Sequence, residues 1–382
     1  MKKYLILFLT PLLINNSIFS QAINGSFLFQ GNPRTYIVYV PASYSSVTSL
    51  PLVIVYHGVG GNQNGIMGMT GFNAIADTAN FMVAYPTALP YNSVNTWNIG
   101  GINPGVDDVG FTSALIDTLK ANYPKITLCK VYATGFSMGS GMVQQLACDL
   151  TSRIASIASV AGGVPLTISG TCAPSRSISV FNMKGTTDNY NGNSIELGAQ
   201  QTIDYWNQKN FCNLTAVQTT LPNLVNDGYT VDRFDYTPCS SGTENVLYRI
   251  NNGPHAWIGS GANNGLNDIN TSVEVWNFLK KYSNPAVNGC MTSDENEKNQ
   301  SPKMSVDPNP STGDFSVDYV GVSGRSHVNI YDSFGRKIYS CELENRRDGK
   351  LSINISEFPS GFYFLFFFSG NSVQTKKIIV QK

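Results

Sequence analysis

The sequence predicts an α/β protein whose first part, residues 21–283, forms a doubly wound, mainly parallel sheet, followed by a small all-β sandwich over residues 306–382. Three observations favour this prediction. Short apolar runs alternate with segments of helical periodicity in the first part. After Ser283 the helical segments stop, and short strand patterns follow between turn residues. A tight glycine–serine turn joins an apolar run to a helical segment near the middle of the first part.

Composition argues against one class of function. The formal net charge is zero and charged residues make up 13% of the chain, so nothing in the composition suggests the basic face that a nucleic-acid partner would need. Hydrophobic residues make up 42%, which is enough for a substantial core. We therefore expect a globular protein without a nucleic-acid partner.

The N-terminus predicts export. Lys2 and Lys3 precede an apolar run, residues 4–14, and Ser20 is a small residue before a possible cleavage point. This order is typical of a signal peptide over residues 1–20. Export permits disulfides among the seven cysteines, and no CxxC pair or Cys/His cluster indicates a zinc site.

The first part contains strand and helix patterns in alternation. The run PLVIVY at 51–56 is continuously apolar, as a buried central strand would be. The segment 107–123 has apolar residues at helical spacing and acidic residues in its first turn. We expect strands at 26–30, 35–40, 51–56, 81–85, 131–134, 154–160, 177–183, 231–236 and 246–250, and helices at 72–80, 107–123, 142–150, 201–209 and 270–282.

The last part of the chain begins after a change in residue composition. Residues 284–305 are polar and rich in turn residues, which predicts a linker. The β-domain is then expected over 306–382, with strands at 315–320, 327–331, 337–340, 351–355, 362–368 and 377–380.

The stretch KVYATGFSMGSG at 130–141 contains the G-x-S-x-G pattern between a strand and a helix. This context is typical of a nucleophile elbow, in which a strained turn lifts Ser137 above the sheet edge. Gly135 and Gly139 have no Cβ, so strand and helix can approach closely. The N–H of Met138 then points to where an oxyanion would form.

A glycine-rich loop, residues 57–62, follows the apolar strand at 51–56. A loop in this place supplies the second oxyanion donor in proteins with such an elbow, and we assign that donor to Val59. The alternative is an ordinary turn.

A serine nucleophile needs a base and an acid, and the chain has three histidines. His57 precedes the serine and His327 lies in the β-domain, so His255 is the expected base. Asp188 follows the strand at 177–183 and is the expected acid. The order Ser137, Asp188, His255 matches that of the α/β-hydrolases. The other acidic candidates lie on a helix or in later strands: Asp204, Asp227, Asp232 and Asp235.

Five motifs in order resemble the secreted esterase/poly(3-hydroxybutyrate) depolymerase-like family, which includes feruloyl and acetylxylan esterases of carbohydrate esterase family 1. The resemblance covers about residues 26–282 and implies an α/β-hydrolase fold with the triad on Ser137, Asp188 and His255. The motifs are HGVGGN at 57–62, WN at 97–98 with VDDVGF at 106–111, VYATGFSMG at 131–139, KGTTDNY at 184–190 and GPHAW at 253–257.

Two residues depart from the pattern of that family. Met138 stands where a smaller residue is more common, so GFSMG is also similar to the elbow of bacterial polyester hydrolases, some of which cleave synthetic aromatic polyesters such as PET. Lys184 stands where the family commonly has histidine, and we expect a changed pocket shape there.

The tail resembles the C-terminal sorting domain of the type IX secretion system. The resemblance rests on PNPSTGDF at 308–315, FPSGFYF at 358–364 and TKKIIVQK at 375–382. It implies the type IX secretion machinery as a partner and a location outside the cell or on its surface. A carbohydrate-binding or adhesive β-module is the alternative from the residues alone.

The family resemblance also suggests two disulfides, Cys212–Cys239 and Cys148–Cys172. Cys129 lies just before the nucleophile strand, where the terminal helix should end, so a pair with Cys290 is geometrically possible.

Three aromatic residues are predicted to bind substrate. Trp257 lies beside the base and Trp97 lies in a loop near the elbow, so both could form walls for a ring-containing acyl group, together with Phe136 of the elbow. Ordinary packing is the equal alternative for the two tryptophans.

The sequence therefore predicts a secreted serine ester hydrolase that needs no cofactor or metal, acts as a monomer and cleaves a polymeric ester. Polyester, aromatic or hydroxyalkanoate, ranks first. Feruloyl or acetyl esters on plant polysaccharide are the alternative. A peptidase of the same fold is less favoured, and a non-catalytic surface binding protein is the alternative of another class.

Overall fold

The chain folds into two compact units that divide after Cys290. The structure, a computed structural model, describes residues 20–189, 195–259, 268–287, 290, 303–320, 326–332, 336–343, 349–369 and 372–382. The predicted signal peptide lies outside these residues apart from Ser20. Most of the predicted linker, residues 291–302, also lies outside them.

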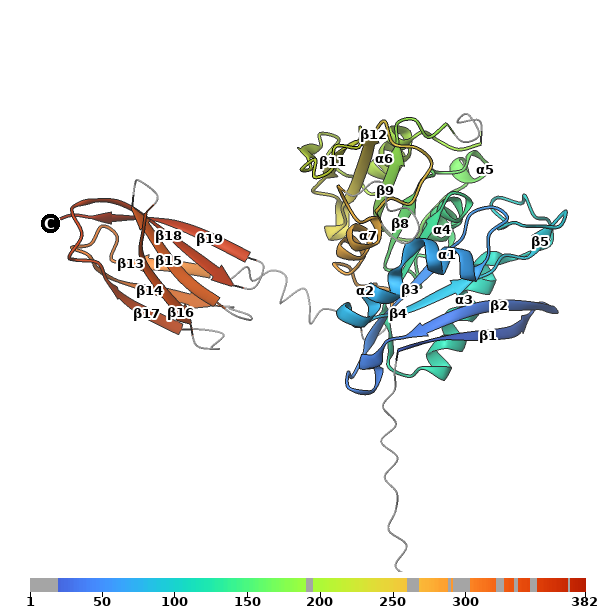
Figure 1. Cartoon of the computed structure of the whole chain (residues 1–382), viewed down its shortest axis with the longest axis horizontal. Helices are drawn as coiled ribbons and strands as arrows, with labels where there is room; N and C mark the ends of the chain where they lie inside the picture. The colour runs from blue at the N-terminus through green and yellow to red at the C-terminus, as the bar shows by residue number, and fades with distance from the viewer. Residues whose placement is uncertain are drawn as a thin grey trace, which may run out of the picture. The chain divides into compact units, whose positions relative to one another are not determined.

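A ten-stranded sheet forms the centre of the first unit (Figure 1). Its order is β1-β2-β4-β3-β7-β8-β9-β12-β11-β10, and the strands from β4 to β12 run parallel. The remaining pairs at both edges are antiparallel. The strands are β1 Gln21–Phe29, β2 Asn32–Val40, β3 Leu50–Tyr56, β4 Met82–Pro86, β7 Ile126–Phe136, β8 Ser156–Val160, β9 Ser179–Gly185, β10 Val217–Thr220, β11 Thr230–Tyr236 and β12 Asn245–Asn251.

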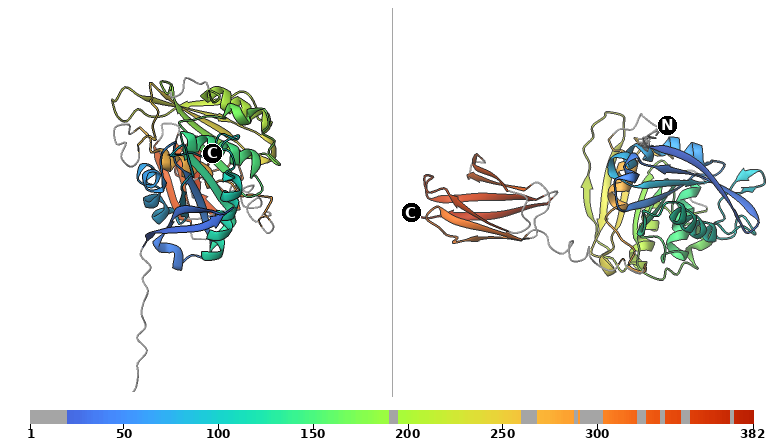
Figure 2. Two further views of the ribbon diagram at one scale, coloured as in Figure 1. Left: turned by 90° about the vertical axis from the view of Figure 1, so that its right-hand side faces the viewer. Right: turned by 90° about the horizontal axis from the view of Figure 1, so that it is seen from below.

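Helices cover both faces of this sheet, as the two further views in Figure 2 also show. One face packs against α3, α4 and α6, and the other packs against α1, α2 and α7. This arrangement confirms the predicted doubly wound α/β-hydrolase fold. The helices are α1 Gln63–Thr70, α2 Phe72–Ala79, α3 Asp108–Asn122, α4 Met138–Asp149, α5 Leu166–Ser169, α6 Ala199–Lys209 and α7 Thr271–Leu279.

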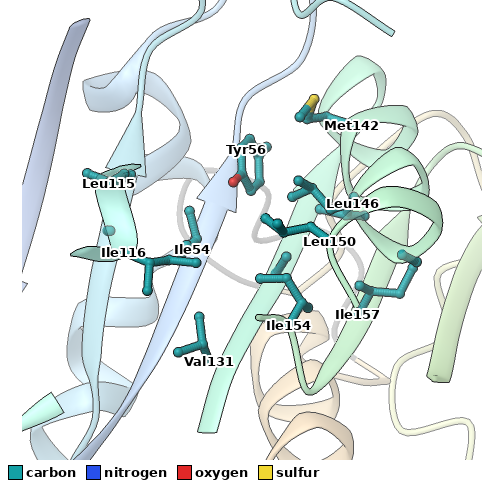
Figure 3. Packing of buried hydrophobic residues seen from close by; sticks show 14 of the residues in the cluster. Ile54, Tyr56, Leu115, Ile116, Val131, Met142, Leu146, Leu150, Ile154 and Ile157 are labelled. Carbon is teal, nitrogen blue, oxygen red and sulfur yellow. The ribbon is translucent and has the colours of Figure 1, made fainter. Parts of the chain in front are cut away.

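Branched and long apolar side chains fill the space between β3, β7 and the helices α3 and α4 (Figure 3). Ile54, Val131 and Leu146 are fully buried there. Each such side chain stabilises the fold by about 1.5–3 kcal/mol relative to exposure. The packing holds β7 and α4 rigidly, and these are the two elements that meet at Ser137.

Several short elements escape prediction from the sequence. Helix α1 contains two glycines and little apolar periodicity. It begins because the Asn62 side chain accepts hydrogen bonds from the N–H groups of Asn64 and Gly65. A hairpin of two-residue strands, β5 Pro90–Tyr91 and β6 Val94–Asn95, lies in a segment for which no strand was predicted.

The first unit extends beyond the predicted boundary at Ser283. Asn284 is fully buried, its N–H donates to the Cys129 carbonyl, and its Nδ2 donates to Thr151. Cys129 and Cys290 form a disulfide across a separation of 161 residues. The segment from Asn284 to Cys290 therefore belongs to the first unit, and the prediction that the linker begins at Asn284 was wrong.

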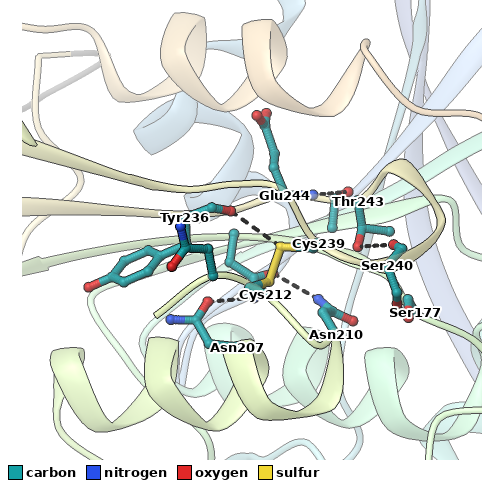
Figure 4. Close-up of a disulfide and its surroundings, with 12 residues drawn as sticks. Ser177, Asn207, Asn210, Cys212, Tyr236, Cys239, Ser240, Thr243 and Glu244 are labelled. Carbon is teal, nitrogen blue, oxygen red and sulfur yellow. Dashed lines mark hydrogen bonds between the residues drawn. A yellow bond between two sulfur atoms is a disulfide. The ribbon is translucent and has the colours of Figure 1, made fainter. Parts of the chain in front are cut away.

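Two further disulfides, Cys148–Cys172 and Cys212–Cys239, close short loops of the first unit. Figure 4 shows Cys212–Cys239 beside the end of α6, where the N–H of Cys212 donates to the Asn207 carbonyl. Cys341 of the second unit is free. All three pairings anticipated from the sequence are thus present.

The second unit is a sandwich of two antiparallel sheets around its own core, which includes Val317, Val328 and Phe367. One sheet has the order β13-β14-β17 and the other β16-β15-β18-β19. The strands are β13 Lys303–Asp307, β14 Asp314–Val320, β15 Ser326–Asp332, β16 Lys337–Leu343, β17 Gly349–Asn354, β18 Gly361–Ser369 and β19 Ser372–Val380. In the described part of the chain, no helix combines the length and the apolar character that crossing a bilayer requires.

We predict that Gly139→Ala destabilises the first unit by at least about 2 kcal/mol, because a Cβ there would collide with the carbonyl groups of Tyr56 and His57. Gly68→Ala is the matched control, since its Cβ would meet no atom within 4 Å on the exposed face of α1. Urea unfolding of both variants measures the difference. Equal stability of the two variants would contradict the proposed crowding.

Candidate active site

Ser137 lies at the junction of β7 and α4 in a strained backbone conformation. Its φ is 56° and its ψ is −118°, a combination that a residue with a Cβ rarely adopts. The Ser137 N–H donates to the Val160 carbonyl at 3.0 Å, which fixes the turn to the neighbouring strand β8. A Cβ on Gly135 would collide with the main chain of Gly139, so the turn requires glycine at both positions.

Asp188 and His255 form a hydrogen-bonded pair. The Nδ1 atom of His255 lies 2.9 Å from Oδ1 and 3.0 Å from Oδ2 of Asp188. A carboxylate only accepts, so Nδ1 of His255 carries the proton and donates it to Asp188. The Asp188 side chain is 1% exposed and that of His255 is 22% exposed. The buried carboxylate can therefore orient an imidazole that is partly exposed.

The loops that carry these two residues are joined by hydrogen bonds. The N–H of Thr187 donates to the Gly253 carbonyl, and the N–H of Asn252 donates to the Thr186 hydroxyl. Gly185 allows this approach, because a Cβ there would collide with the Gly253 carbonyl. Residues 67 positions apart in the sequence are thus held within hydrogen-bond distance.

The loop after β3 lies against the elbow. A Cβ on Gly58 would lie 3.2 Å from the Ser137 Cβ, so this loop reaches the serine. The Gly60 N–H donates to the Asn95 carbonyl, and the Asn95 side chain donates to the Gly61 carbonyl. These two bonds to Asn95 of β6 fix the loop at Gly60 and Gly61. Met138 is the first residue of α4, so its N–H has no acceptor within the helix.

The buried ring of His57 holds the loop by hydrogen bonds at both of its nitrogens. Its Nε2 accepts from the Ala88 N–H, so its Nδ1 carries the proton and donates to the Gly58 carbonyl. The indole of Trp97 donates to the His57 carbonyl at 2.9 Å. Burial lowers the pKa of His57 to about 4, so the ring stays neutral at physiological pH.

A buried ion pair holds the loop that carries Trp97. Asp108 accepts from Arg34 at 2.5 Å and from the N–H of Asn98 at 2.7 Å. The guanidinium of Arg34 lies over the ring of Phe111 at 3.6 Å. Both charged side chains are almost fully buried, so the loss of either would leave an unpaired charge in the core.

A cavity of about 500 Å³ opens beside Ser137 and His255, which both line it. Its other polar lining side chains are Thr167 and Glu196, and the rest of its wall is largely apolar. The apolar lining residues are Val59, Ile99, Ile102, Met138, Ala161, Pro165, Leu166 and Ile195. Among the described residues no group of three or more His, Cys, Asp or Glu is arranged to hold a metal ion.

The prediction of tryptophan walls was wrong. Trp97 and Trp257 are both 0% exposed and do not line the cavity. The Trp257 indole donates to Ser272 inside the core, and that of Trp97 supports the loop as described above. Phe136 packs against the imidazole of His255 with ring centroids 4.9 Å apart, and it does not line the cavity either.

Much of the wall comes from residues that sequence reasoning missed. Pro165 to Thr167 follow β8 in the chain, and Ile195 and Glu196 follow β9. Their position after strand carboxyl ends was the available signal. The sequence does not show that Pro165 pairs with Glu196, because this pairing depends on contacts between distant segments of the chain.

Two family models match the chain. Residues 34–180 match the esterase PHB depolymerase family, and residues 305–381 match the secretion system C-terminal sorting domain. Both matches confirm the resemblances stated from the motifs. The tail thus carries the signal for type IX secretion, as predicted.

The curated relatives are esterases. Feruloyl esterase B of Piromyces equi is 30% identical over 273 residues, which cover 66% of this chain and 46% of the relative. A bifunctional acetylxylan esterase/xylanase of Neocallimastix patriciarum is 26% identical, with 74% of this chain and 37% of the relative covered. The chain spans less than half the length of these two relatives.

Among solved structures, the acetyl xylan esterase from Aspergillus awamori has a TM-score of 0.45 and 13% sequence identity. The match covers 58% of this chain and 89% of that one.

We predict that acid weakens the fold through His57. Burial lowers its folded pKa from 6.5 to about 4, so the unfolded chain binds a proton more readily between these values. Stability therefore falls as pH drops through this window. The stability advantage of the natural chain over His57→Gln should shrink by about 2 kcal/mol between neutral pH and about pH 4.5.

Urea unfolding at both pH values, followed by tryptophan fluorescence, measures this change. Because both proteins share every other titrating group, their difference isolates His57. A gap between the two proteins that stays constant with pH would show that His57 does not titrate as described.

Proposed function

We propose that the first unit is a serine carboxylic-ester hydrolase that removes aromatic acyl groups of the feruloyl type from plant polysaccharide. The observation that carries the proposal is the shared cavity of Ser137 and His255, with Asp188 holding Nδ1 of the same imidazole. Ser137 is then the nucleophile, His255 the base and Asp188 the residue that orients it.

The reaction proceeds in two acyl transfers. Nε2 of His255 takes the Ser137 proton while Oγ bonds to the ester carbon. The N–H groups of Met138 and Val59 donate to the developing oxyanion. The alcohol leaves with the proton from His255. Water, deprotonated by the same imidazole, then attacks the acyl-enzyme and releases the acid.

The relatives favour polysaccharide esters over the polyester that ranks first from the sequence alone. These relatives are a feruloyl esterase and a bifunctional acetylxylan esterase/xylanase. The cavity favours the larger acyl group of the two, because about 500 Å³ is within the usual range for a drug-sized ligand. An acetyl group would leave most of its apolar wall in contact with water.

We predict that Ser137→Ala lowers kcat/KM for methyl ferulate by at least about 10⁴-fold, because the acyl-enzyme cannot form. Ser49→Ala, on the exposed surface away from the cavity, should keep the full rate. Ultraviolet absorbance follows the hydrolysis. If Ser137→Ala retained the natural rate, the nucleophile would lie elsewhere.

A substrate panel separates the candidate activities. The natural protein should hydrolyse methyl ferulate faster than p-nitrophenyl acetate relative to their spontaneous rates, and should release little acid from polyester films. Faster release from a PET or polyhydroxybutyrate film would instead support a polyester hydrolase. No hydrolysis of any member would support a non-catalytic binding protein.

A further inference from the structure

One member of a largely buried ion pair lines the cavity, and the proposed reaction does not use it. Nζ of Lys184 lies 2.6 Å from Oε1 of Glu196, and the two side chains are 4% and 17% exposed. Lys184 is the residue that departs from the family pattern at the end of β9. Glu196 lines the cavity together with Ser137 and His255.

Glu196 is held in place by its main chain and by its side chain. It forms an isolated β-bridge with Pro165, flanked by hydrogen bonds from Leu166 to Ile195 and from Leu197 to Val164. Its Oε2 accepts from the Gly163 N–H at 3.0 Å, while Oε1 accepts from Lys184. The carboxylate therefore has a fixed position in the cavity wall.

The Glu196 carboxylate can accept a further hydrogen bond. Its two oxygens offer about four lone-pair positions, of which these contacts use two. The surrounding wall is apolar, so a hydroxyl that reaches this place finds an acceptor in partly dry surroundings. A methyl ether at the same position has no hydrogen to donate.

We propose that Glu196, positioned by Lys184, determines acyl specificity by accepting a hydrogen bond from a hydroxyl on the aromatic ring of the substrate. This inference rests on the proposed function and narrows it to hydroxylated aromatic acids. Glu196 is a specificity residue and takes no part in acyl transfer. Lys184 is a positioning residue that acts through it.

Two esters that differ at one ring position test this inference. Methyl ferulate has a free phenolic hydroxyl, and methyl 3,4-dimethoxycinnamate has a methyl ether in its place. A hydrogen bond to a charged acceptor predicts that the natural protein prefers methyl ferulate by at least about tenfold in kcat/KM. Glu196→Gln should reduce this preference to within about threefold, with little change for the dimethoxy ester.

A second variant removes the risk that an unpaired lysine disrupts the fold. The double substitution Lys184→Gln, Glu196→Gln removes both charges at once and should lose the preference in the same way. Thr167→Val is the matched control. Apart from Ser137, Thr167 is the lining residue with a hydroxyl, and its replacement leaves the ion pair intact. It should keep the preference for methyl ferulate.

Binding separates this inference from the proposed function. In the Ser137→Ala background, calorimetry should show tighter binding of methyl ferulate than of the dimethoxy ester, and Glu196→Gln should abolish the difference. This result would support the inference even if no ester were hydrolysed. Equal binding of the two esters, or an equal loss of rate for both in Glu196→Gln, would reduce the ion pair to a structural element and overturn the inference.

Discussion

The close crossing of β7, α4 and β3 at Ser137 is the constraint on which the rest of the site depends. Gly139 packs directly on the main chain at the end of β3, and Gly135 packs on Gly139. Ser137 can hold its strained φ of 56° because the buried core fixes the strand before it and the helix after it. The same crossing brings the loop after β3 against the serine, so the proposed nucleophile and the proposed oxyanion donors share one support.

The remaining parts are aligned by main-chain contacts between loops. The turn after β9 is bonded to the loop after β12, which brings Asp188 to His255. The loop after β3 is fixed by β6 and by the neutral ring of His57. Buried groups thus do the positioning, while part of the cavity wall comes from exposed residues such as Ile102, Leu166 and Ile195. Substrate specificity can then vary without disturbing the fold.

Features that depend on a local sequence pattern could be predicted, and features that depend on contacts between distant segments could not. The central strands and longer helices have local apolar patterns, so each of them was predicted, although β7 begins at Ile126 and not at Val131. The pattern around Ser137 carried enough local information to find the elbow. Helix α1 and the cavity wall at Glu196 depend on a capping side chain and on contacts between distant loops. Trp97 was misplaced for the same reason, since a tryptophan beside a motif packs inward or outward according to neighbours that sequence spacing does not reveal.

The most direct test of the account is the site of covalent labelling by an organophosphonate that mimics the tetrahedral intermediate. The folded protein would be treated with one equivalent and mapped by peptide mass spectrometry. We expect one adduct per chain, on Ser137, and none when Asp188 and His255 are separated by prior unfolding in urea. No adduct on Ser137 in the folded protein, or equal labelling of other serines, would contradict the central claim that this strained serine is the activated nucleophile.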